Sequence, residues 1–125
     1  MTTGEGVPQA FVVEDDNLIA DIFTTALKQV GYAAEKITGG AEAIQRLKMS
    51  VPDLVVLDIH MPIVSGLEVL KFIQGDERLS GVTVIVITAD ALAAQRLSGQ
   101  VEHVLVKPVG FYQLKLLGEA LKAEL

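Results

Sequence analysis

Short apolar runs alternate with amphipathic stretches along the chain after residue 8. Runs that are apolar at nearly every position are typical of parallel strands buried on both faces, and runs 54–57 and 82–87 have this pattern. The run at 33–37 carries Glu35 and Lys36 and therefore predicts an edge strand. Five strands are predicted, over residues 10–13, 33–37, 54–57, 82–87 and 102–106.

The stretches between these runs have apolar residues at helical spacing. The first helix is predicted to end at Gly31, and the third to begin at a capping box formed by Ser65 and Glu68. Asp90 is expected to cap a poorly patterned helix that ends near Leu97. The residues expected to face inward are Ile19, Ile22, Phe23, Ala26, Leu27 and Val30 in the first helix, Ala41, Ile44 and Leu47 in the second, Leu67, Leu70 and Ile73 in the third, and Leu114, Leu117 and Leu121 in the last, which spans about residues 110–123.

This strict alternation predicts a single α/β domain. Strand–helix–strand units with short loops form right-handed crossovers, so the five strands should make a parallel sheet with helices on both faces. The 125 residues match one domain, over residues 9–125, after a flexible N-terminal tail over residues 1–8.

Composition excludes several classes of protein. The absence of cysteine excludes disulfides, zinc–thiolate sites and iron–sulfur clusters. A net charge of −6 without a Lys/Arg cluster argues against a nucleic-acid partner. The apolar runs are too short to span a membrane, and residues 1–10 do not have the pattern of a signal peptide, so we expect a cytoplasmic protein.

Polar residues close four of the predicted strands at the edge where ligands bind in open α/β sheets. They are Glu14, Asp15 and Asp16 after the first run, Asp58 after the third, Thr88 after the fourth and Lys107 after the fifth. Two carboxylates ~4 Å apart repel by ~4 kcal/mol near a protein surface, so the cluster needs Lys107 and a hard cation such as Mg²⁺ or Mn²⁺. An aspartate can be a covalent nucleophile, and a hydroxyl, an ammonium group and a cation suit phosphoryl transfer.

Five segments in register resemble the receiver domains of two-component response regulators, of which the chemotaxis regulator is an example. They are Glu14-Asp15, the run from Leu54 through Asp58 to Pro62, Ser65-Gly66, Val86-Ile87-Thr88-Ala89 and Val106-Lys107-Pro108. The resemblance implies a flavodoxin-like (βα)5 fold and a phosphoprotein of a phosphorelay. It also implies phosphorylation by a sensor histidine kinase or a histidine phosphotransfer protein, and readout by a downstream protein or by a homodimer. No enzyme activity is implied beyond self-phosphorylation from a phosphodonor and self-dephosphorylation.

The resemblance also implies a role for each site residue. Asp58 would be the phosphoacceptor, and Thr88 and Lys107 would contact the phosphoryl oxygens. The metal would be held by Glu14, Asp15, Asp58 and the carbonyl oxygen of His60. The Lys107–Pro108 peptide bond is expected to be cis, and Asp16 to cap the first helix.

The sequence leaves two functions open besides that of a phosphorylated receiver domain. A phosphohydrolase with an aspartyl nucleophile would also use such residues, although it would need a second Asp where this chain has His60. A scaffold could keep the fold without being phosphorylated. The sequence does not identify the kinase, the target, the oligomeric state or the rest of a longer chain, and Val104 replaces the aromatic residue that often moves in the family.

Overall fold

The computed structural model describes residues 6–125, so residues 1–5 of the predicted tail lie outside the described part. Five strands form one parallel sheet in the order β2-β1-β3-β4-β5, which confirms the predicted fold class. The strands are β1 (Gln9–Val13), β2 (Ala33–Ile37), β3 (Leu54–Asp58), β4 (Thr83–Thr88) and β5 (His103–Val106). The helices are α1 (Asn17–Gln29), α2 (Gly40–Met49), α3 (Gly66–Gln74), the 3₁₀ turn η2 (Glu77–Leu79), α4 (Ala91–Leu97) and α5 (Phe111–Lys122).

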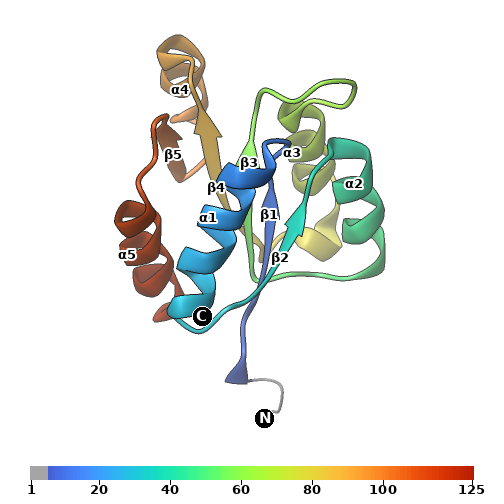
Figure 1. Cartoon of the computed structure of the whole chain (residues 1–125). Coiled ribbons are helices and arrows are strands. Elements are labelled where there is room, and N and C mark those ends of the chain that lie inside the picture. The colour runs from blue at the N-terminus through green and yellow to red at the C-terminus, as the bar shows by residue number, and fades with distance from the viewer. Residues whose placement is uncertain (1–5) are drawn as a thin grey trace.

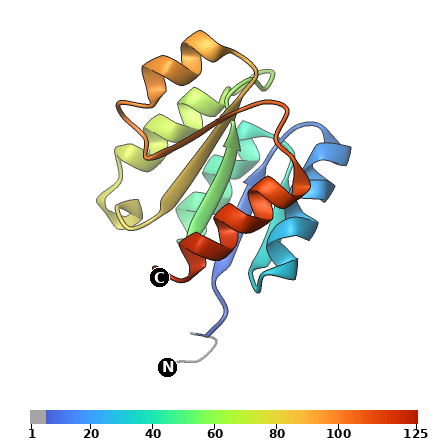
Figure 2. The ribbon, with the colours of Figure 1, turned by 90° about the vertical axis from the view of Figure 1, so that its left-hand side faces the viewer.

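The sheet separates two hydrophobic cores. Side chains alternate along a strand, so Phe11 and Val13 of β1 enter one core while Ala10 and Val12 enter the other. Helices α1 and α5 cover the Ala10 side, and α2 and α3 cover the Phe11 side (Figures 1 and 2). Because both faces are covered, β1 and β3 are almost wholly buried, as their apolar sequences predict.

Three predicted helix starts are confirmed by their hydrogen bonds. The Asp16 carboxylate accepts from the Ile19 amide 3.1 Å away and caps α1. Ser65 and Glu68 form the reciprocal capping box of α3. Asp90 caps α4 by accepting from the amides of Leu92 and Ala93. Each capping side chain therefore accepts a hydrogen bond from a helix amide that would otherwise lack a partner. The caps define the residues at which the loops from the sheet edge end and the helices begin.

Some predicted inward faces are wrong. Ala41 is exposed, whereas Leu47 is buried as predicted, together with Gly40 and Ala43. Leu67 is 41% exposed, because the buried stripe of α3 passes through Gly66, Val69 and Ile73. Ile22 of α1 is also partly exposed, at 39%. The other large predicted residues of these helices, such as Leu47, Ile73 and Leu27, are buried, so the buried stripe is narrower than the predicted one.

Strand bounds differ by one residue at several places. β1 begins at Gln9 and β5 begins only at His103. Val82 precedes β4 rather than opening it, because its amide donates to the carbonyl of Leu79 and closes the turn of η2. Among residues 6–125, no helix is both long enough and apolar enough to cross a bilayer.

Candidate functional site

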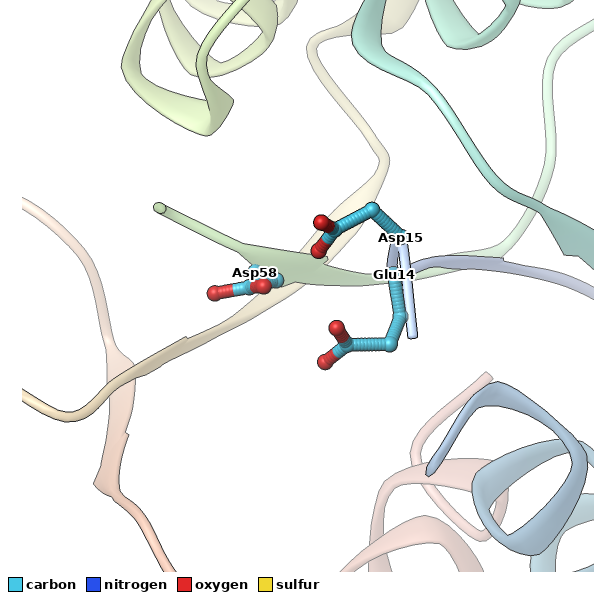
Figure 3. Close-up of side chains that lie close together, drawn as sticks. All are labelled: Glu14, Asp15 and Asp58. Atoms are coloured by element: carbon cyan, nitrogen blue, oxygen red, sulfur yellow. The ribbon is translucent and has the colours of Figure 1, made fainter. Parts of the chain in front are cut away.

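Three carboxylates meet at the carboxyl edge of the sheet. Strands β1 and β3 are hydrogen-bonded neighbours, and Val13 of β1 stands opposite Leu57 of β3. Glu14, the residue after β1, therefore lies beside Asp58, the last residue of β3. Glu14, Asp15 and Asp58 each offer an oxygen within 4.8 Å of the other two. Figure 3 shows the three carboxylates turned toward one region of space. The sequence-predicted acidic residues therefore form one cluster.

Two of these carboxylates are buried. Glu14 is 1% exposed and Asp58 2% exposed, whereas Asp15 lies at the surface. Glu14 Oε2 accepts from the Asp16 amide at 3.2 Å, and Asp58 Oδ1 accepts from the His60 amide at 3.1 Å. Glu14 Oε1 has no hydrogen-bond partner among the described residues. A buried carboxylate oxygen that accepts no hydrogen bond is unfavourable unless a positive charge lies beside it.

Lys107 lies against both buried acids. Its Nζ is 3.4 Å from Glu14 Oε1 and 3.4 Å from Asp58 Oδ2. The backbone places it there, because the Lys107 amide donates to the carbonyl of Thr88 and continues the pairing of β4 with β5. The Lys107–Pro108 bond is cis, as predicted. One ammonium group therefore contacts two of the three carboxylates of the cluster.

Thr88 and His60 complete the edge. Thr88 ends β4 and is fully buried, and its Oγ1 lies 3.0 Å from the His60 Nε2 and accepts from the Asp90 amide at 3.0 Å. The sequence suggested the carbonyl of His60 as a metal ligand and placed His60 and Asp90 beside the proposed phosphoryl group, but it did not predict this contact between the His60 and Thr88 side chains. The adjacency of β3 and β4 was the available signal, because a residue just past Asp58 can reach the end of the neighbouring strand.

Gly66 lets the chain pass closely over the end of β3. A Cβ atom on Gly66 would lie 2.0 Å from the Asp58 carbonyl oxygen and 2.6 Å from the Ile59 Cα. The Gly66 amide donates to the Ile59 carbonyl at 2.9 Å, which holds the start of α3 against this loop. The 59–65 loop is therefore fixed at both ends beside Asp58.

The electrostatics of the cluster follow from its burial. Burial raises the pKa of Glu14 from 4.5 to about 7; the charge of Asp58 adds to this, and the Asp16 amide and Lys107 oppose it. For Lys107, burial lowers the pKa, but the nearby charges of Asp58 and Glu14 outweigh it and raise the pKa overall. Protons and a cation thus compete for the same carboxylates.

The donor set fits a hard divalent cation. All available ligands are oxygens, and Mg²⁺ prefers sites with one or two carboxylates and open positions for water. The side chains that could hold the cation are those of Glu14, Asp15 and Asp58. Among the described ion pairs, Lys107 is the cation that contacts Glu14 and Asp58 and Asp15 has none, so the carboxylates outnumber the positive charge beside them.

Replacing Glu14 with glutamine should stabilise the metal-free protein at alkaline pH. Because the native pKa of Glu14 is about 7 and the unfolded value is 4.5, the native state holds the extra proton between these values. Stability therefore falls as pH rises through this window, and the fall should total roughly 3 kcal/mol at about pH 8. Urea unfolding with a chelator should show a flatter pH dependence for Glu14→Gln than for the wild type.

The exposed Glu119 supplies the control for this measurement. A Glu119→Gln protein should follow the wild-type pH dependence. Addition of Mg²⁺ should stabilise the wild type more than Glu14→Gln, because the variant has lost a negative ligand. Equal pH dependence in wild type and Glu14→Gln would contradict the account of the buried carboxylate.

Comparisons with known proteins agree with one another. A family model described as the response regulator receiver domain matches residues 10–117. The polar-differentiation response regulator DivK of Brucella ovis is 38% identical over 81 residues, which cover 65% of this chain and 66% of DivK. A signal receiver domain from Vibrio parahaemolyticus superposes with a TM-score of 0.83 at 28% identity, covering 94% of this chain and 92% of that one. Response regulator TrrA of Thermotoga maritima, solved in complex with Mg²⁺–BeF, has a TM-score of 0.80 at 30% identity, covering 92% of this chain and 99% of that one.

Proposed function

The chain belongs to the response regulator receiver domain family, and from this membership we propose that Asp58 accepts a phosphoryl group and thereby switches a protein-binding surface. The resemblance drawn from the motifs is confirmed at the level of the family, which places the chain in two-component signalling. Receiver domains are signalling modules, so the only chemistry that we propose is the gain and loss of the chain's own phosphoryl group.

The contact of Lys107 with Asp58 carries this proposal. An Asp carboxylate that merely capped a helix would not need a buried position beside a second carboxylate and an ammonium group. Nucleophilic attack on a phosphoryl group needs exactly that combination of acceptor oxygen and positive charge, because negative charge develops on the transferred oxygens. Lys107 Nζ, at 3.4 Å from Asp58 Oδ2, is in place to contact them.

In the proposed step, an Asp58 carboxylate oxygen attacks the phosphorus of a phosphohistidine. A P–O bond to Asp58 forms while the P–N bond to the donor imidazole breaks, and the electron pair returns to the imidazole nitrogen. A divalent cation held by Glu14, Asp15, Asp58 and the carbonyl of His60 would neutralise charge on the phosphoryl oxygens. The Mg²⁺–BeF complex described for TrrA supports a role for Mg²⁺ in this chain.

Thr88 links the new phosphoryl group to the surface. Its hydroxyl now contacts His60 and the Asp90 amide, and Asp90 caps α4. We propose that Thr88 exchanges the His60 contact for a phosphoryl oxygen, which would shift the loop that leads into α4. A covalent charge at Asp58 would thus bias the position of a surface helix.

A partner surface for the phosphodonor lies next to Lys107. A groove of about 360 Å³ is lined by Ile19, Ile22, Phe23, Lys107, Pro108 and Val109. Leu18, which lies in α1 like Ile19 and Ile22, is 70% exposed. We propose that a histidine kinase or histidine phosphotransfer protein docks here, because apolar contacts beside Lys107 would bring its phosphohistidine to Asp58.

Replacing Ile22 with aspartate should slow phosphotransfer from such a protein by about tenfold or more, because a charge enters an apolar contact. Phosphorylation by a small-molecule phosphodonor should proceed at the wild-type rate, since Ile22 is not part of the acidic cluster. Leu116→Asp, which alters an exposed residue of α5, is the matched control. Equal loss with both donors would show a damaged site rather than a lost docking contact.

The function is tested by incubation with Mg²⁺ and phosphoramidate, followed by intact mass spectrometry. The protein should gain the mass of one phosphoryl group, and a chelator should prevent the gain. No gain with Mg²⁺ would favour the scaffold alternative. Sustained hydrolysis of p-nitrophenyl phosphate would favour a phosphohydrolase.

A further inference from the structure

A second groove lies at the opposite end of β4 from the acidic cluster. It has a volume of about 600 Å³ and lies between the end of α3, η2, the start of β4 and the segment before β5. Its residues include Val82 and Val84, whereas Thr88 closes the other end of the strand. At about 3.3 Å per residue, the groove and Thr88 are more than ~10 Å apart along the strand. It is therefore separate from the proposed phosphorylation site.

The groove exists because α4 is short. α4 has seven residues and rises by about 10 Å, whereas the six residues of β4 extend for about 20 Å. Figure 1 shows α4 near the carboxyl end of β4. The amino end of β4 is flanked instead by the irregular segment that includes Gln100 and Val101. Apolar side chains that a longer helix would cover are left lining a groove.

The lining combines an apolar floor with an acidic rim. Ile73 and Leu79 are core residues that reach the groove, and Val84 and Val101 are only partly buried. The acidic residues of the lining are Asp76, Glu77 and Glu102, and no lysine or arginine is among the lining residues. Arg78, the nearest basic residue in sequence, donates to the Leu47 carbonyl and to Asp76. Both Glu77 and Glu102 are exposed; among the described ion pairs Glu77 has no partner, and Glu102 is paired only with the His103 ring, at 3.8 Å.

We propose that this groove binds a cationic amphipathic segment of a partner protein, with aliphatic side chains in the groove and Lys or Arg against Glu77 and Glu102. An apolar floor favours burial of aliphatic groups, and the one-sided negative rim selects positive charge and orients the segment. Thr83 and Val84, at the amino end of β4, pair with β3 and lie before the residues that pair with β5, so the groove follows this end of the strand. The proposed recognition through side chains does not depend on phosphorylation of Asp58.

The test uses a helical peptide of leucine and lysine in an amphipathic pattern, added to ¹⁵N-labelled protein in the presence of Mg²⁺. Amide shifts should be largest around the groove, at Gly75, Gly81 and Val101. The same peptide with serine in place of leucine, and the same peptide with glutamate in place of lysine, should not bind. Shifts centred on Glu14 and Asp58 would overturn the proposal, as would shifts at the groove that depend on protein concentration without peptide.

Charge reversal at the rim distinguishes peptide binding through Glu77 and Glu102 from attraction of the peptide to the net negative charge of the protein. The double variant Glu77→Lys/Glu102→Lys should weaken peptide binding by at least about tenfold. The double variant Glu119→Lys/Glu124→Lys alters net charge equally at exposed residues in and after α5 and should keep the wild-type affinity within about twofold. Equal weakening in both variants would overturn the proposal, because the acidity of the whole chain would then explain binding.

Discussion

Replacing Asp58 with asparagine is expected to abolish the gain of a phosphoryl group under Mg²⁺ and phosphoramidate. The amide has nearly the same shape as the carboxylate, but its oxygen is a poor nucleophile, so the bond to phosphorus should not form. Neither neighbour is well placed to substitute. Glu14 Oε2 accepts from the Asp16 amide, and the pKa of Glu14 is raised by burial to about 7, which weakens its negative charge at neutral pH. Asp15 is exposed, without the contact to Lys107 that Asp58 has.

Intact mass measures this result directly, and Asp21→Asn is the control. Asp21 is an exposed aspartate that pairs with Lys36 on the surface, so its replacement should leave phosphorylation unchanged. Thermal unfolding of Asp58→Asn should show a folded protein, because the change removes a buried charge beside Glu14 rather than a packing contact. A full mass gain in Asp58→Asn would mean that another residue is the acceptor.

The fold and the acidic cluster are predictable from the sequence because both depend on local signals. The apolar strands and the acids that follow them define the sheet edge, and parallel pairing then brings Glu14 beside Asp58. Lys107 is predictable in the same way, from its position after the last strand. Short right-handed connections between parallel strands leave few other arrangements for the residues at the strand ends.

Features that depend on how elements pack could not be predicted. Ala41 and Leu67 look like inward residues, but the buried residues at these helix starts are their neighbours Gly40 and Gly66. A Cβ on Gly40 would lie 2.3 Å from the Val64 carbonyl oxygen, and Gly66 is as tightly confined against Asp58. The contact of His60 with Thr88 is of the same kind, since it depends on the path of that loop.

The cluster is unfavourable for the metal-free domain, and its surroundings offset this. Two buried carboxylates, one of them with an oxygen that accepts no hydrogen bond, oppose folding, while the two cores and the backbone bonds at the loop ends favour it. The proposed phosphorylation of Asp58 would need the loop beside this residue to keep its position while the carboxylates lie close together. The glycines at the starts of α2 and α3 make that rigidity sterically attainable.

Replacing Gly66 with alanine should therefore destabilise the protein by about 3 kcal/mol or more. The added methyl group would meet the Asp58 carbonyl oxygen at 2.0 Å and the Ile59 Cα at 2.6 Å, which are backbone atoms that no rotamer change can move away. Relief requires α3 or the end of β3 to shift, and that shift breaks the bond from the Gly66 amide to the Ile59 carbonyl. Urea unfolding followed by circular dichroism measures the loss.

Gly99→Ala is the matched control, because a Cβ there has no atom within 4 Å and its backbone is not left-handed. Its stability should stay within about 0.5 kcal/mol of the wild type. The folded fraction of Gly66→Ala should also react more slowly with phosphoramidate, since the displaced backbone is that of Asp58 itself. If Gly66→Ala unfolds at the same urea concentration as Gly99→Ala, the start of α3 is not packed against the backbone of Asp58 and Ile59 as closely as this prediction requires.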